Sequence, residues 1–171
     1  MDSSTADRLT FLRRLRAVKE YTPEPIPDPV IEDILEVGRW SASGGNRQPW
    51  QVVVIRDPEV KQKLGEWGAR PAATAAVVLL IVMATETPSL DEGRLAERLC
   101  LGAAAHGLGS TVATLKNEGP DAVKQLLGIP AERRAVALVA IGHIDREARR
   151  ARPRNPQPRK PIGEFARWDR F

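Results

Sequence analysis

The hydrophobic positions of the chain follow two kinds of spacing. Where apolar residues recur every three or four positions, they predict amphipathic helices over residues 7–18, 28–37, 57–66, 90–106 and 120–127. Where they cluster within six to eight positions, they predict strands over residues 50–55, 76–83 and 136–141. The run 76–83 contains no polar residue, so we expect it to be buried on both faces of a sheet.

Proline, aspartate and glycine mark the ends of these elements. The Asp-Pro pairs at 28–29 and 57–58 are typical of an N-cap followed by proline in the first turn of a helix. Gly128 follows the helix predicted at 120–127 and is expected to close it. Residues 22–27 contain three prolines, so we expect an extended segment between the first two helices.

The helix predicted at 90–106 is rich in alanine and glycine. Because small side chains let two backbones approach closely, we expect this helix at a tight helix–helix contact, within the chain or at a subunit seam. Helices and strands alternate less strictly than in a doubly wound sheet, which favours the α+β class.

The 171 residues are expected to form a single domain, of which the last part, residues 145–171, is a tail of different character. Residues 145–171 are rich in proline and arginine and show no apolar periodicity until three aromatic residues, Phe165, Trp168 and Phe171. A segment that cannot build its own core yet ends in large aromatics is expected to dock, on a partner subunit or on its own chain.

Composition narrows the classes of function. The hydrophobic fraction of 42% and the charged fraction of 28% are typical of a globular protein, and the lone Cys100 excludes an internal disulfide framework and a multi-cysteine metal site. Residues 145–160 carry a charge of +5 within a net charge of +4. No aromatic residues interleave these basic side chains, so we expect no nucleic-acid partner. Solvation, a phosphate group or an acidic surface explains the basic tail better.

The longest apolar run, residues 72–84, is too short to span a bilayer, and the first residues lack the pattern of a signal peptide. We therefore expect a cytoplasmic protein with no membrane partner.

Several catalytic classes lack their residues. The chain has no Gly-x-Ser-x-Gly elbow, no Walker loop and no Rossmann glycine fingerprint. Its acids and two histidines lack the spacing of a metal site or of a general acid–base pair. We therefore predict no metal and no catalytic side chain, which is typical of an enzyme whose bound cofactor carries the chemistry.

The most distinctive motif is the loop 43–50, Ser-Gly-Gly-Asn-Arg-Gln-Pro-Trp, which leads directly into a predicted strand. Its two glycines allow the backbone to approach a ligand closely. The side-chain amides of Asn46 and Gln48 donate and accept hydrogen bonds, which suits the edge of a flat heterocycle. An ordinary connecting loop is the alternative interpretation.

This loop resembles the Asn-x-Gln-Pro-Trp signature of the nitroreductase family of FMN enzymes. Further stretches are similar to that family in the same order along the chain. Residues 15–21 resemble its N-terminal basic segment, residues 104–111 its alanine-rich helix and Gly-Leu-Gly turn, and residues 158–162 its C-terminal basic motif.

The resemblance implies an FMN site formed by Arg16, Ala17, Lys19, Ala42, Ser43, Gly44, Asn46, Gln48, Thr114, Leu115, Lys116, Arg159 and Lys160. By the family pattern, Lys19 would lie beside N1 and O2 of the flavin, and one backbone N–H of residues 114–116 would point at N5. Arg159 and Lys160 would return to the phosphate, and the loop 42–48 would reach the flavin of the other subunit. Leu15 and Ala17 depart from the pattern, since a guanidinium and a hydroxyl usually serve the phosphate there.

The same resemblance implies a nitroreductase-like α+β fold with a mostly antiparallel sheet, assembled as an intertwined homodimer. The implied reaction is ping-pong, with NADH or NADPH reducing FMN and an electron-poor substrate such as a nitroaromatic or a quinone following. The short link 65–71, where larger relatives carry extra helices, implies an open site with broad substrate acceptance. A specialised oxidative reaction and a non-catalytic flavin-binding or basic-tailed interaction protein stay open as alternatives.

Overall fold

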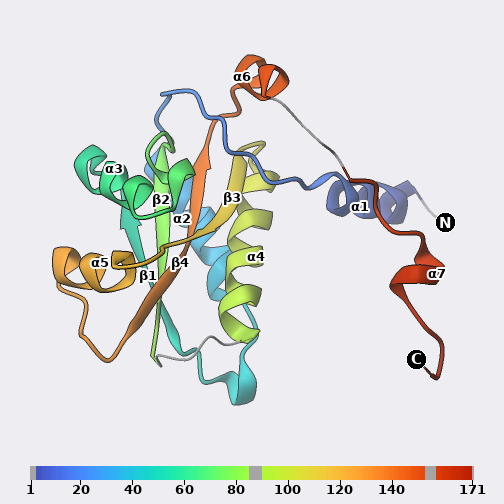
Figure 1. The fold of residues 1–171 in the computed structure, drawn as a ribbon. Helices are drawn as coiled ribbons and strands as arrows, with labels where there is room; N and C mark the ends of the chain where they lie inside the picture. The colour runs from blue at the N-terminus through green and yellow to red at the C-terminus, as the bar shows by residue number, and fades with distance from the viewer. Residues whose placement is uncertain (1–2, 85–89, 153–156, 171) are drawn as a thin grey trace.

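A four-stranded antiparallel sheet lies between two pairs of helices (Figure 1). The computed structural model describes residues 3–84, 90–152 and 157–170. Its strands are β1 (Trp50–Ile55), β2 (Val77–Met83), β3 (Gly109–Thr114) and β4 (Arg134–Gly142). Their order is β1-β2-β4-β3, and every neighbouring pair is antiparallel. β3 is therefore an edge strand.

Two helices cover each face of the sheet. The helices are α1 (Ser3–Arg14), α2 (Asp28–Arg39), α3 (Pro58–Glu66), α4 (Leu90–Ala105), α5 (Gly119–Leu127), α6 (Arg146–Ala151) and α7 (Ile162–Phe165), with 3-10 turns η1 (Gly44–Asn46) and η2 (Arg70–Ala72). α2 and α4 pack on one face, and α3 and α5 pack on the other. α1 and the C-terminal segment that bears α7 stand away from this body (Figure 1). The α+β fold class is thus confirmed.

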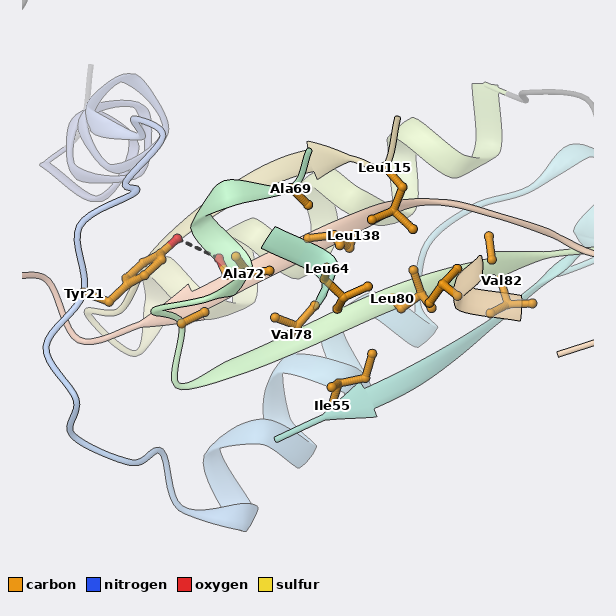
Figure 2. Packing of buried hydrophobic residues seen from close by; sticks show 14 of the residues in the cluster. Tyr21, Ile55, Leu64, Ala69, Ala72, Val78, Leu80, Val82, Leu115 and Leu138 are labelled. Carbon is orange, nitrogen blue, oxygen red and sulfur yellow. Dashed lines mark hydrogen bonds between the residues drawn. The ribbon is translucent and has the colours of Figure 1, made fainter. Parts of the chain in front are cut away.

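Strand β2 holds the two layers together. All seven of its residues are buried, as expected for a run without a polar residue. The side chains alternate between the faces, so Leu80 belongs to the cluster under α3 and α5 (Figure 2), whereas Leu79 belongs to the cluster under α2 and α4. Each fully buried aliphatic side chain contributes about 1.5–3 kcal/mol, so one strand anchors both layers.

The predicted element ends are confirmed at two positions and wrong at a third. Asp57 caps α3, because its carboxylate accepts the N–H groups of the second and third helical residues at 2.8 and 3.1 Å. Gly128 closes α5 in the left-handed conformation, with φ 65°. Asp28, in contrast, is not an N-cap. Pro27 occupies the cap position of α2, and the carboxylate of Asp28 pairs with Arg56.

The tight contact predicted for the alanine-rich helix exists within the chain, between α4 and α2. A Cβ added to Gly102 of α4 would lie 3.2 Å from the Cα of Ile34 in α2. A Cβ on Gly38 of α2 would lie 2.5 Å from Leu99 of α4. Glycine at both positions therefore lets the two helices approach. The alternative role of this helix at a subunit seam stays a prediction.

Three other expectations differ from the structure. The first helix was predicted to reach residue 18 but ends at Arg14, and residues 15–20 form no helix or strand. β3 was not predicted, because its residues are small and four of the six are polar or glycine. α6 and α7 are only six and four residues long and lie in a tail where no helix was expected. Phe171 lies outside the described residues.

Residues 15–22, here called the docked segment, pack against the end of the sheet where two glycines face each other. Gly109 of β3 and Gly142 of β4 are partners in the strand register. A Cβ on Gly109 would lie 2.7 Å from Val18, and a Cβ on Gly142 would lie 2.8 Å from the ring of Tyr21. The absence of two side chains thus makes the space that Val18 and Tyr21 fill.

Hydrogen bonds hold the docked segment in that place. The N–H of Val18 donates to the carbonyl of Ser110 in β3 at 2.8 Å. The buried hydroxyl of Tyr21 lies 2.6 Å from the carbonyl oxygen of Val18 and 3.0 Å from that of Ala140. Figure 2 shows Tyr21 at one end of the core cluster, with its hydroxyl in a hydrogen bond. Burial raises the pKa of Tyr21, so the hydroxyl stays protonated and remains a donor.

We expect Gly142→Ala to destabilise the fold by about 1–3 kcal/mol, because the new methyl group would overlap the Tyr21 ring. Gly93→Ala is the matched control, since a Cβ on Gly93 of α4 meets no atom within 4 Å. The control is expected to stabilise by up to about 1 kcal/mol through helix propensity. Urea unfolding measures both free energies. Equal stability of the Gly142→Ala variant and the unsubstituted protein would contradict the packing described.

Candidate functional site

The outer edge of β3 is open between two covered stretches. In the antiparallel pair with β4, backbone groups of alternate β3 residues point toward β4 or away from it. The outward carbonyl of Ser110 is covered by the docked segment, and the outward N–H of Lys116 donates to the carbonyl of Trp67 at 2.8 Å. Between them, the N–H groups of Val112 and Thr114 point outward and have no partner within the described residues. This edge therefore offers two backbone donors to a ligand.

A hollow of about 720 Å³ lies along the open edge. It is called the lysine hollow and is lined by Lys19, Glu20, Gly68, Arg70, Pro71, Val112, Ala113, Thr114, Lys116 and Arg152. It brings together three predicted site residues, Lys19, Thr114 and Lys116, from distant parts of the sequence. Four of its side chains are cations and one is an acid, so it favours a ligand that carries or develops negative charge.

The one acid of the lysine hollow, Glu20, already has partners within the chain. Its carboxylate accepts a hydrogen bond from Arg152 at 2.7 Å and lies 4.0 Å from Arg149. Burial opposes ionisation of Glu20, but the hydrogen bonds from Arg152 and from the N–H of Lys19, with the two guanidinium charges, hold its pKa below the ordinary value. Glu20 therefore fastens the docked segment to α6.

Two glycines shape the wall of the lysine hollow that Arg70 and Lys116 line. Gly68 has φ +100°, and a Cβ there would lie 3.0 Å from the Cγ of Lys116. A Cβ on Gly119 would lie 2.7 Å from the Cβ of Trp67. Together with the hydrogen bond from Lys116 to Trp67, these contacts hold the turn after β3 against the loop before η2. Arg70, the first residue of η2, and Lys116 therefore share one wall.

A second hollow, of about 350 Å³, adjoins the first, since Val112 lines both. It is called the arginine hollow and is lined by Leu15, Arg16, Ala17, Glu97, Cys100, Ala104, Leu108, Ser110, Thr111, Val112 and Arg159. It gathers three more of the predicted residues, Arg16, Ala17 and Arg159. A ligand with a ring in one hollow and an anionic end in the other would span both.

The two arginines of this hollow differ in how they are engaged. Nη1 of Arg16 lies 2.6 Å from the carbonyl oxygens of both Arg13 and Leu15, so it satisfies carbonyls at the end of α1. Arg159 is exposed and makes no hydrogen bond or ion pair within the described residues. Leu15 and Ala17 supply no polar side chain. Arg159 is thus the freer cation for an anionic group.

Cys100 is a neutral residue in the lining of the arginine hollow. Burial raises the pKa of its thiol, and the hydrogen bond with Ser110 offsets this only in part. A raised pKa leaves less of the reactive thiolate, so the surroundings of Cys100 do not favour a nucleophilic role.

The predicted loop 42–48 lies beside the start of α4, where the N–H of Gly44 donates to Asp91 at 3.2 Å. Asn46 and Gln48 have φ of 53° and 48°, values that are rare for residues other than glycine. None of its predicted site residues lines either hollow: Ala42, Ser43, Gly44, Asn46 and Gln48. Their implied reach into the site of another subunit stays a prediction.

Two other predicted residues lie apart from the hollows. Leu115 is buried, and its N–H donates to the carbonyl of Val136 at 2.9 Å. Because the N–H of Lys116 is also taken, Thr114 has the one free amide of the three residues expected near N5. Lys160 is exposed and lines neither hollow.

Sequence reasoning missed Arg70 and Arg152. Both are exposed arginines without a motif around them, and only the tertiary fold brings them to the edge of β3. No local signal could have identified them.

Neither a metal centre nor a membrane segment is found in the part of the chain that the structure describes. No three His, Cys, Asp or Glu side chains come together there as ligands would. None of the helices in those ranges combines the length and the apolar character needed to cross a bilayer.

Comparison with known proteins points to one family. The model of the nitroreductase family matches residues 12–87 and 72–143. A protein from Archaeoglobus fulgidus named NADH dehydrogenase/NAD(P)H nitroreductase is 31% identical, over 79% of this chain and 84% of its own length. A protein from Thermus thermophilus named NADH dehydrogenase is 28% identical, over 95% of this chain and 96% of its own.

Solved structures agree on the fold. An FMN-dependent nitroreductase from Clostridium difficile superposes with a TM-score of 0.77 at 18% identity, covering 95% of this chain and 99% of that one. At this identity the likeness is one of fold. The nitroreductase-like architecture expected from the motifs is thereby confirmed.

We expect Arg152→Gln to raise the pKa of Glu20 toward its ordinary value of 4.5, because its main hydrogen-bond donor is removed. The native pKa is lowered, so the stabilisation from this contact is present above pH 4.5 and is lost as the pH falls through the native pKa. NMR titration of the Glu20 carboxyl carbon measures both values. Arg150→Gln removes an exposed charge from the same helix and is expected to leave the titration unchanged. An unaltered Glu20 pKa in Arg152→Gln would refute the assigned contact.

Proposed function

Because the chain belongs to the nitroreductase family, we propose that it is an FMN-dependent oxidoreductase that uses NADH or NADPH to reduce electron-poor acceptors such as nitroaromatics and quinones. Family membership and the names of relatives matched over most of their length support an oxidoreductase. The observation that best supports a flavin ligand is the open edge of β3, which has cationic side chains beside its outward N–H groups.

The residues of the lysine hollow fit the ring of a flavin. The outward N–H of Thr114 is a backbone donor of the kind that a ring nitrogen such as N5 accepts. Lys19 lines the same hollow and supplies positive charge for the pyrimidine edge, where a reduced flavin carries negative charge. The ring would thus lie along an edge that already has its donors pointing outward.

The residues of the arginine hollow fit the phosphate. Arg159 supplies a free guanidinium, which binds phosphate through paired N–H groups, and Arg16 lies in the same hollow. Glu97 opposes an anion there, and Leu15 and Ala17 contribute no donor side chain. We therefore assign most of the phosphate affinity to Arg159.

When bound, FMN supplies the redox chemistry at N5, and in each turnover one NAD(P)H and one proton convert a nitro group to a nitroso group with release of NAD(P)⁺ and water. The chain's own residues would bind the flavin and orient its ring. Thr114 would hold its amide proton toward the ring, Lys19 would favour negative charge on it, and coenzyme and acceptor would reach the ring in turn from the solvent side of the hollow. If both use that same side, the reaction would be ping-pong, as the family resemblance implies.

The proposed enzyme acts as a homodimer with a site at each subunit interface. The tail leaves Ile162, Phe165 and Trp168 exposed to 77, 79 and 90%, and such apolar side chains gain from burial against another surface. The loop 42–48 presents its amides to solvent outside both hollows, where a second copy is able to receive them. We propose that the tail docks on the partner and that the loop completes the partner's site.

We expect the protein to take up FMN with a change in the visible absorption spectrum, and the bound flavin to bleach on anaerobic addition of NADH or NADPH. Arg159→Gln is expected to weaken FMN binding about tenfold, because a charge-assisted hydrogen bond to phosphate is lost. Riboflavin has no phosphate and serves as the control ligand, so its affinity is expected to be the same in both proteins. Titration followed by flavin fluorescence measures all four values.

The outcomes separate the alternatives. A protein that takes up no flavin would contradict the proposed function and favour an interaction protein. A bound flavin that neither coenzyme bleaches would favour the non-catalytic flavin-binding alternative.

We expect sedimentation velocity to give a species of twice the 18.8 kDa chain mass. The double variant Phe165→Ser, Trp168→Ser is expected to shift the protein toward the single-chain mass, because the apolar surface offered to the partner is removed. Leu126→Ser removes an exposed apolar side chain from α5 and is the matched control. A monomer at all concentrations would rule out the dimer.

A further inference from the structure

The lysine hollow holds more positive charge than a flavin ring requires. Of its four cations, Arg152 is paired with Glu20 at 2.7 Å. Lys19, Arg70 and Lys116 have no acidic partner within the described residues. If Lys19 serves the pyrimidine edge, as the proposed function assigns it, the side chains of Arg70 and Lys116 have no assigned role, because residues 114–116 were expected to offer the flavin a backbone N–H.

These two cations form one wall of the hollow. Arg70 opens η2, and Lys116 follows β3, two residues after the free amide of Thr114. The contact of Gly68 with the Lys116 side chain and the hydrogen bond from Lys116 to Trp67 join the two segments. The fold therefore holds together the two backbone segments that bear these cations, and both side chains line the hollow proposed for the ring.

From this wall we infer that the acceptor is a small aromatic carboxylate, whose carboxylate is bound by Arg70 with help from Lys116 while its reducible group lies over the flavin. This inference rests on the proposed function. The fork of a guanidinium matches the two oxygens of a carboxylate, and an ammonium beside it adds charge. The open site then selects acceptors by charge and admits many ring shapes.

The position of Arg70 and Lys116 also indicates that they bind the acceptor and not the coenzyme. Arg70 and Lys116 share the hollow with Thr114, so an anion bound between them is close to the flavin ring. The 2′-phosphate of NADPH lies at the adenosine end, remote from its nicotinamide. A cation pair beside the ring therefore suits a carboxylate attached directly to the reducible aromatic.

The test compares 4-nitrobenzoate with 4-nitrobenzamide, which share the ring and the nitro group and differ in charge. The measured quantity is the ratio of their kcat/KM values for the flavin-loaded protein, with a saturating coenzyme. In Arg70→Gln we expect this ratio to fall about fivefold, the size typical of losing one solvent-accessible charge contact. Arg70→Lys keeps the charge and is expected to restore most of the ratio. Lys63→Gln removes an exposed cation from α3 and is the matched control.

A binding measurement gives a readout independent of turnover. Benzoate cannot be reduced, and its dissociation constant for the flavin-loaded protein follows from the perturbed flavin absorption. We expect this constant to rise about fivefold in Arg70→Gln and to stay unchanged in Lys63→Gln. Benzamide is the neutral probe, and it should not respond to the loss of Arg70.

Two outcomes would overturn the inference. An equal ratio of the two kcat/KM values in the Arg70→Gln variant and in the unsubstituted protein would show that Arg70 does not distinguish a charged acceptor from a neutral one. A rise in the KM for NADPH, without one for NADH and without a change in the ratio, would assign Arg70 to the coenzyme. Failure to take up FMN would instead be a failure of the proposed function, and the spectrum reveals it before any acceptor is added.

Discussion

The packing of Val18 and Tyr21 against Gly109 and Gly142 determines where everything else in the site lies. The docked segment pairs with β3 only as far as Ser110, because the two large side chains fix its register at the paired glycines. The outward amides that follow in β3 remain open as a result. Val18 is buried against the sheet, whereas the next residue, Lys19, is exposed and lines the lysine hollow. The packing of Val18 therefore places the Lys19 charge beside the open edge of β3.

An open strand edge is normally a hazard, since unpaired amides invite pairing with another chain. Here the open stretch is short and its surroundings are cationic, which discourages the approach of a similarly charged strand. The cations stay near solvent, so they carry little of the desolvation penalty of a buried charge. Glu20, the acid that would cancel one of them, is engaged by Arg152 instead. A positive hollow is thereby maintained without burying an unpaired charge.

Much of the fold was predictable because local chemistry and tertiary structure agree. The unbroken apolar run of β2, the cap at Asp57 and the closing Gly128 depend on residues close in sequence. β3 was missed because Gly-Ser-Thr-Val-Ala-Thr becomes a strand by pairing with β4, and that partner lies more than twenty residues away. Helix α1 ended early because tertiary docking of Val18 prevails over helical periodicity.

The candidate site likewise has one part that sequence motifs predicted and another part that only the tertiary structure reveals. Resemblance identified six residues that the fold gathers into two adjoining hollows, from Arg16 to Arg159, because the family motifs mark them. Arg70 has no motif and needed the structure. The loop 42–48 lies outside both hollows, and its proposed partner is a second copy of the chain. If loop and flavin do share that interface, subunit association and flavin binding are thermodynamically linked, and each strengthens the other by the same factor. The exposed aromatics of the tail would then contribute to cofactor affinity without touching the cofactor.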